Sequence, residues 1–447
     1  MKLRTALLAT ACTVFAASVG CFAYAQTGTI DLSAQEKARE AQPNNINTPR
    51  HPETDYELNP APEQPNPVHH LLYVATPGDG GGDGESGMVV LDADHGYRFV
   101  KRISWGIPAS ELPGAKVTGI TASVPLNMIF VTYIGHMIGI DLKTDKIAWT
   151  FNGESGVVRH FKSASGTGCC ERPWTLPDGK TLLVGSSYNN WWYYINGATG
   201  KVEGKIVVPD SPVAHNMAVT PDGKIGMLGS ETPTMSIVDV PNRKLMRTIT
   251  FSDSVRPLTI NHDGSLVYAT LNNLDGFEIG DVKTGKVIKR VELPGAMWKA
   301  KWLDPTNHFF GHSNPSHGIG VTPDDSEIWV SDDVNVAWQI WDNPGDGRNP
   351  VYNPSKTVPV TPGTSSSWIS ITNNGKLAFL GDGSVVDVKT HKVINVLKDE
   401  YGRRLHAVEK DLFLAFQDGR LIETNNQFAV GDPKAFAARN MTKQARE

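Results

Sequence analysis

Polar residues suited to ligand binding recur at one fixed spacing in this chain. Each stands eight residues before the last residue of a short turn rich in Asp, Asn and Gly. These residues are Glu171, His215, Arg256, His317 and Ser367. Guanidinium groups form bidentate hydrogen bonds with carboxylates or phosphates, and imidazoles add donors whose charge depends on pH. If the fold brings these positions together, their chemistry predicts a site that holds an anion.

Two further residues join this set. Arg172 opens the phrase Arg-Pro-Trp-Thr and Arg256 opens Arg-Pro-Leu-Thr, so we expect both arginines at equivalent places. Trp368 adds an aromatic ring directly after Ser367. The alternative is that these polar groups bind only water and one another. The predicted ligand-binding residues are Glu171, Arg172, His215, Arg256, His317 and Trp368.

A metal site is a second interpretation of the histidines. His215 and His317, with His312 or Glu171, offer donors that suit zinc, copper or iron. His308 and His312 have helical spacing, but Gly311 between them and the nearby prolines argue against a helix. We therefore assign no metal ligands, and a divalent metal stays open as a cofactor. The chain has no Gly-x-Ser-x-Gly, Walker, His-Glu-x-x-His or Cys-x-x-Cys-His motif, so catalytic residues are unknown.

The spacing repeats because whole segments of the chain repeat. In each segment a turn such as Pro221-Asp222-Gly223 precedes an apolar run, and a phrase such as Asp281-Val282-Lys283-Thr284-Gly285 closes a second run. Asp-Gly turns between β-branched runs are typical of antiparallel hairpins, and a period near 40 residues is typical of propeller blades. We predict an all-β, seven-bladed β-propeller with four-stranded antiparallel blades around a central channel. Six complete blades are expected near 114–152, 169–209, 214–251, 255–294, 312–360 and 365–398.

The seventh blade has to be completed by a distant segment. Strands expected at 70–76, 88–92 and 97–103 lack a first strand of their own. We expect residues 403–409 to supply it and so to close the ring. An eight-bladed ring is the alternative if residues 412–423 build a blade of their own.

These phrases resemble those of the YVTN-type seven-bladed propellers, a superfamily similar to lactonase-like propellers and to the large subunit of quinoprotein amine dehydrogenases. The resemblance covers roughly residues 69–425 and implies the fold more than the function, because propellers of one geometry host enzymes and binding platforms alike. Residues 139–149 also look like the tryptophan-docking repeat of PQQ dehydrogenases. Other blades carry Thr248, Arg290 or Val396 in the region where Trp149 ends this one, so PQQ is not expected.

The charge and hydropathy of the chain argue against nucleic-acid binding and a membrane span, and its first residues suggest export. The net charge of -5 gives no nucleic-acid footprint, and no later apolar run is long enough to span a membrane. Residues 1–25 resemble a secretory signal peptide that ends at Ala23-Tyr24-Ala25, which predicts a periplasmic or secreted protein. Acylation of Cys21 in a lipoprotein is the alternative. Residues 26–68 are expected to form a linker or strap, 69–425 the propeller and 426–447 a flexible tail.

Removal of the signal peptide would leave Cys169 and Cys170 as the only cysteines. Adjacent cysteines in an oxidising compartment are able to form a vicinal disulfide, and two buried thiols are the alternative. A vicinal disulfide flanks the cofactor in quinoprotein alcohol dehydrogenases, which this chain resembles only in part. The functional expectation is an exported propeller that binds a small anionic ligand or a protein partner at one axial mouth. The alternative is an enzyme on the same scaffold, either a lactonase-like metal-dependent hydrolase or a quinoprotein amine dehydrogenase-like oxidoreductase subunit.

Overall fold

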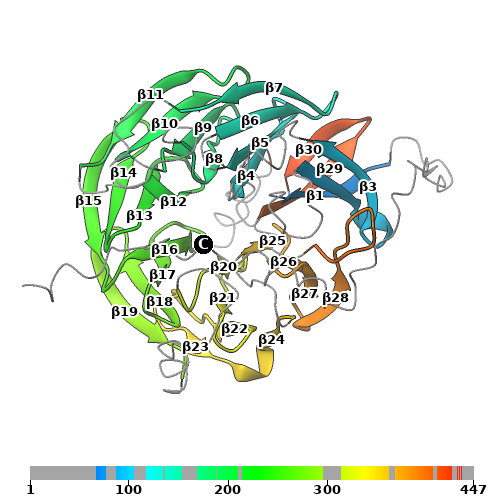
Figure 1. Ribbon diagram of the computed structural model, residues 1–447. Coiled ribbons are helices and arrows are strands. Elements are labelled where there is room, and N and C mark those ends of the chain that lie inside the picture. The colour runs from blue at the N-terminus through cyan, green and yellow to red at the C-terminus, as the bar shows by residue number, and fades with distance from the viewer. Residues whose placement is uncertain are drawn as a thin grey trace, which may run out of the picture. The chain divides into compact units, whose positions relative to one another are not determined.

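The computed structural model confirms the seven-bladed β-propeller, with seven antiparallel sheets arranged around one axis (Figure 1). It describes residues 67–76, 87–104, 117–133, 136–153, 169–187, 189–209, 214–294, 314–361, 368–405 and 410–424, together with 430, 432 and 434. The expected signal peptide, Cys21 and most of the expected linker and tail lie outside these residues. No helix in the described ranges is long and apolar enough to cross a membrane.

Six blades are built from consecutive strands, close to the limits expected from the repeats. The first three are β4 (Val117–Ser123), β5 (Met128–Tyr133), β6 (His136–Asp141) and β7 (Lys146–Phe151); β8 (Pro173–Thr175), β9 (Thr181–Gly185), β10 (Trp191–Asn196) and β11 (Val202–Val207); and β12 (Ala214–Val219), β13 (Ile225–Ser230), β14 (Thr234–Asp239) and β15 (Lys244–Thr250). The next three are β16 (Val255–Ile260), β17 (Leu266–Leu271), β18 (Gly276–Asp281) and β19 (Lys286–Glu292); β20 (Ile319–Val321), β21 (Glu327–Asp332), β22 (Ala337–Asp342), β23 (Val351–Tyr352) and β24 (Val358–Pro359); and β25 (Ile369–Ile371), β26 (Leu377–Leu380), β27 (Ser384–Asp387) and β28 (Lys392–Val396).

The remaining strands form the blade that closes the ring, in the order β3-β2-β1-β29-β30. They are β1 (His69–Thr76), β2 (Gly87–Asp92), β3 (Arg98–Ser104), β29 (Lys410–Gln417) and β30 (Arg420–Thr424), and two short 3-10 turns, η1 (Ala93–His95) and η3 (Pro354–Lys356), complete the regular structure of the described residues. The innermost strand of each blade lies against those of its two neighbours, in the order β4, β8, β12, β16, β20, β25, β29 and back to β4. The ring is therefore closed with seven members.

The segment expected to close the ring was placed wrongly. β29 pairs with β1 from His69↔Phe416 to Ala75↔Lys410, so residues 410–417 supply the missing strand instead of 403–409. Every second residue of β29 from Leu412 to Phe416 is apolar and faces the same side of the strand. Leu412, Leu414 and Phe416 belong to the same apolar cluster as Tyr73 of β1, which explains why β29 pairs with β1. The eight-bladed alternative is also wrong, because β30 extends the closing sheet and starts no new blade.

The repeated turn phrase acts through local hydrogen bonds. The Asp281 carboxylate accepts from the backbone N–H of Thr284 at 2.7 Å and from its hydroxyl at 2.9 Å. Gly285 follows with φ of 71°, a left-handed conformation that glycine adopts without strain. The phrase therefore fixes the hairpin between the two outer strands of a blade.

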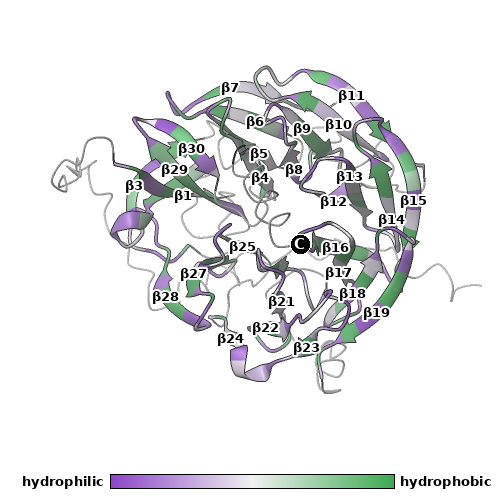
Figure 2. Cartoon of the chain, turned by 180° about the vertical axis from the view of Figure 1, so that it is seen from behind, coloured by the Kyte–Doolittle hydropathy of each residue, from purple (hydrophilic) through white to green (hydrophobic). Residues whose placement is uncertain are grey.

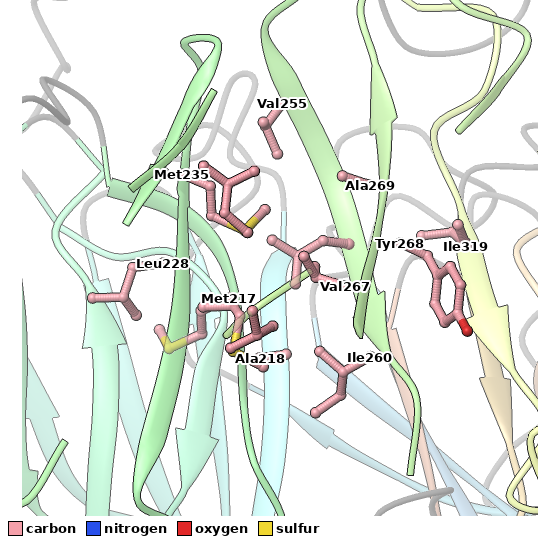
Figure 3. Close-up of a cluster of buried hydrophobic side chains, with 14 of the residues drawn as sticks. Met217, Ala218, Leu228, Met235, Val255, Ile260, Val267, Tyr268, Ala269 and Ile319 are labelled. Carbon is pink, nitrogen blue, oxygen red and sulfur yellow. The ribbon is translucent and has the colours of Figure 1, made fainter. Parts of the chain in front are cut away.

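Burial decreases from the inner strands of a blade to the outer ones. All six residues of β17 are buried, whereas β19 alternates between exposed and partly buried side chains. Figure 2 shows the same alternation of hydrophilic and hydrophobic residues along β15 and β19. Between neighbouring blades, Met217 and Leu228 pack with Val267 in a continuous apolar layer (Figure 3). This close packing fixes the inner strands on which the candidate site is built.

Trp149 of β7 shows how one blade docks on the next. Its indole N–H donates to the carbonyl oxygen of Gly197 at 2.8 Å. A Cβ at Gly139 or Gly200 would lie 2.4 or 2.6 Å from the indole ring, so these two positions leave room for it only as glycine. Trp149 is thus a structural contact between blades.

Candidate functional site

The candidate site lies where the innermost strands begin. Arg172 directly precedes β8, His215 and Arg256 are the second residues of β12 and β16, and Trp368 directly precedes β25. Lys410 is the first residue of β29. Innermost strands of a propeller run in one direction along the axis, so their first residues meet at one end of the channel. We call the cluster of Arg172, His215, Glu231, Arg256, Trp368 and Lys410 the mouth.

A carboxylate that the repeats did not reveal organises one side of the mouth. Glu231 accepts from Arg256 Nη1 at 2.6 Å, and its Oε1 atom lies 3.8 Å from His215 Nε2. Arg256 Nε also donates to the side-chain oxygen of Asn272. Glu231 is therefore a carboxylate partner of Arg256 at the mouth.

Burial controls the charge of this side. It lowers the pKa of His215 to about 4, against the opposing effect of Glu231 and with the help of Arg256 and Lys410. His215 is therefore neutral near pH 7. Burial alone would raise the pKa of Glu231, but His215 and Arg256 outweigh it and the net shift is downward. Since His215 is neutral at that pH, Arg256 is the partner that keeps Glu231 ionised.

The other side of the mouth stacks cations on aromatic rings. The Arg172 guanidinium carbon lies 4.7 Å from the centre of the Trp368 ring and 5.5 Å from that of Trp174. Lys410 Nζ lies 4.0 Å from the centre of Trp368. Arg172 Nη1 donates to Asn216 Oδ1 at 3.1 Å, and within the described residues no carboxylate forms an ion pair with this arginine. Burial lowers the pKa of Arg172 to about 10, so it remains a cation at neutral pH.

A small pocket continues from Arg172 into the channel. Its free volume is about 60 Å³, which is enough for a few water molecules or a small polar group. Arg172, Trp368, Ser370 and Asp411 line it together with apolar side chains of the innermost strands, among them Leu258, Ile319, Ile371 and Leu412. We call it the channel pocket.

Asp411 is the buried acid of the channel pocket. Its side chain accepts a hydrogen bond from the Ser370 hydroxyl through Oδ1, and Oδ2 has no hydrogen-bond partner in the part of the chain that the structure describes. The residue is only 2% exposed. Burial raises the pKa of Asp411 to about 7, although Ser370 and Lys410 oppose the rise. Both the carboxylic acid and the carboxylate are therefore accessible near neutral pH.

Four of the six predicted binding residues meet at the mouth, namely Arg172, His215, Arg256 and Trp368. Glu171 Cβ and the His215 carbonyl oxygen both approach Gly185, where an added Cβ would lie 3.0 Å from the first and 3.3 Å from the second. The backbone N–H of His317 is held within its own blade, where it donates to Ser331 Oγ at 2.9 Å. Whether any of the six binds a ligand stays a prediction.

Three contributors were missed by sequence reasoning. Glu231 lies in the turn between β13 and β14, which returns to the same end of the channel as the start of β12. Lys410 and Asp411 were missed because β29 was not recognised as an innermost strand. An Asp at the start of a strand of alternating leucines was the one available signal for a buried acid.

Cys169 and Cys170 lie just before Arg172, and both are fully buried. Their sulfur atoms are within bonding distance, and a cis peptide bond joins the two residues. The Cys170 carbonyl oxygen accepts from the Thr118 hydroxyl at 2.7 Å, which ties this pair to β4. The disulfide itself stays a prediction.

Metal ligands do not gather in the described ranges of the chain, where no three His, Cys, Asp or Glu side chains are grouped to hold an ion. His308, His312 and Ser367 lie outside the described residues.

Comparisons with known proteins support no family assignment. No family model matches the chain, and no curated protein matches its sequence. Among solved structures, one described as the crystal structure of the mitotic checkpoint complex has 13% identity and a TM-score of 0.49, over 69% of this chain and 80% of that one. Hydrazine synthase of Kuenenia stuttgartiensis has 15% identity and a TM-score of 0.45, over 61% of this chain and 77% of that one. Membership of the YVTN-type superfamily therefore remains a hypothesis from the repeats.

Proposed function

We propose that this propeller is an anion-binding protein whose ligand enters the mouth and is held by Arg172. The observation that carries this proposal is the partly buried guanidinium on the wall of the channel pocket, with one amide acceptor and no carboxylate partner within the described residues. Partial burial of a cation without an ion-pair partner carries a desolvation cost, and a charge-assisted hydrogen bond to an anion offsets that cost.

The charges of the mouth favour the same ligand. Arg172, Arg256 and Lys410 are cationic, whereas His215 is neutral near pH 7. Glu231 is already paired with Arg256. The Arg172 guanidinium stacks on Trp368, so its positive charge lies on the side of the mouth that opens into the channel pocket. An anion at this position lies in partly buried surroundings, where its attraction to Arg172 is screened less than in water.

The size of the channel pocket limits what enters it. A free volume of about 60 Å³ admits a single small group, such as a carboxylate, rather than a large cofactor. The remainder of a larger ligand would stay outside, over Trp368. Because residues 1–25 resemble a signal peptide, we also propose that the protein is periplasmic or secreted.

Calorimetric titration of the purified full chain with acetate, succinate, phosphate and sulfate, one at a time, tests the proposal. We expect at least one of these anions to bind and Arg172→Gln to weaken it roughly 10- to 150-fold, the effect of losing a hydrogen bond between charged groups. Arg243→Gln is the matched control, because Arg243 also stacks on an aromatic ring, 4.5 Å from the centre of Tyr194, and donates to the Glu203 carbonyl oxygen. Unchanged anion binding in Arg172→Gln, or an equal loss in the control, would overturn the proposal.

A further inference from the structure

We propose that Asp411 is the second ligand-binding group of the channel pocket and that the anion is a short-chain carboxylate, bound together with one proton that Asp411 holds. This inference rests on the proposed function, since Arg172 supplies the positive charge. It adds the class of ligand and the coupling of its binding to pH.

The geometry provides the two halves of a carboxylate site. Arg172 and Asp411 line the same small pocket, from different blades. Asp411 Oδ1 is occupied by Ser370, whereas Oδ2 is buried and has no partner in the described part of the chain. Buried polar atoms normally find a hydrogen-bond partner, so Oδ2 marks the place where a ligand atom or a water molecule belongs.

A protonated Asp411 is a donor at that place. Its O–H group would donate to one oxygen of the ligand carboxylate, and the Arg172 guanidinium would donate to the other. Bonds of the type O–H···O⁻ are shorter than hydrogen bonds between neutral groups and roughly twice as strong. The apolar walls, formed by Leu258, Ile319 and Leu412, suit the short alkyl chain that follows the carboxylate.

Protonation of Asp411 removes the repulsion between its carboxylate and that of the ligand. The groups that face Asp411 are Ser370 and Trp368 from the β25 side, Lys410 from its own strand and Arg172 across the pocket. Two ionised carboxylates this close would repel each other, so the ligand drives a proton from solvent onto Asp411. No covalent bond forms, and the proton returns to solvent when the ligand leaves. Since burial already raises the pKa of Asp411 to about 7, this uptake occurs in the physiological range.

Titration with propionate between pH 5.5 and 8.5, in buffers with different ionisation enthalpies, measures the protons taken up for each ligand bound. We expect a value near zero below pH 6 and close to one above pH 8, with the affinity falling about tenfold for each pH unit in the upper range. Asp411→Asn keeps a neutral donor that cannot titrate. We expect this variant to bind propionate without proton uptake, and more tightly than the wild type at pH 8.5.

Ser370→Ala is the companion variant. It removes a donor that stabilises ionised Asp411, so we expect the midpoint of proton uptake to move to higher pH. Wild-type binding without proton uptake, or an Asp411→Asn variant with the wild-type pH dependence, would overturn the inference while leaving the role of Arg172 intact. Tighter binding of phosphate than of every carboxylate would overturn the ligand class. If Arg172→Gln did not weaken anion binding, the proposed function itself would be overturned.

Discussion

Replacement of Asp411 by Asn is expected to change how the stability of the ligand-free protein depends on pH. The usual pKa of an Asp carboxyl is about 3.9, and burial raises that of Asp411 to about 7. Between these values the folded protein holds a proton that the unfolded chain has released. Wild-type stability therefore falls as pH rises through this window, and the loss is complete above pH 7. The roughly 3 pH units correspond, at about 1.4 kcal/mol for each, to about 4 kcal/mol.

Asn cannot titrate, so Asp411→Asn lacks this loss. Any fixed cost of the amide is the same at every pH and cancels when two pH values are compared. We expect the free energy of unfolding of the variant, relative to the wild type, to rise by about 4 kcal/mol between pH 4 and pH 8. Urea unfolding followed by tryptophan fluorescence, on both proteins at each pH and without small carboxylates, measures it. Parallel curves for the two proteins would show that Asp411 is not a buried acid with a raised pKa.

Three further predictions concern the mouth, the closing strand and the cysteines. Burial holds the pKa of His215 near 4, so the wild type loses stability below pH 6.5 as the unfolded chain takes up the proton. Relative to the wild type, the free energy of unfolding of His215→Gln should therefore rise by about 3 kcal/mol as pH falls from 6.5 to 4. Urea unfolding that shows no relative rise would contradict this. Leu414 is fully buried in β29, so Leu414→Ala should lower the free energy of unfolding by about 2 to 5 kcal/mol, as measured with urea. Ile422 is 37% exposed, and Ile422→Ala should lower it much less. Equal losses would argue against closure by β29. Intact protein should weigh about two mass units less than its fully reduced form if Cys169 and Cys170 are joined, and free alkylation of both thiols before reduction would refute the bridge.

The blades were predictable because their signals are local. Asp281 binds Thr284 three residues away, so the phrase itself contains the interactions that form the turn. The closing strand was harder to predict. The alternation of apolar residues around Leu412 and Leu414 is typical of any half-buried strand and does not identify the strand that pairs with it. The sheet to which β29 belongs is decided by its pairing with β1, which joins residues far apart in the sequence.

The same distinction applies to the site. Arg172, His215 and Arg256 were found because equivalent places in repeated blades lie at equivalent places around the axis. Glu231 was missed because it lies in a turn that carries no repeated phrase. The properties of Asp411 depend on burial against Ser370 of another blade, and spacing along the chain does not reveal burial.

The closure of the ring by β29 also sets the point in synthesis at which the channel pocket is complete. Arg172 is made long before Lys410 and Asp411, and until β29 pairs with β1 the growing chain has an open sheet edge and half a binding pocket. A chain that stops before β29 lacks both the last blade interface and the buried acid. On the proposed function, a ligand that bridges Arg172 and Asp411 would bind only the closed ring and would shift the equilibrium toward closure by mass action. The proposal therefore makes closure of the ring by β29 and completion of the ligand site a single event.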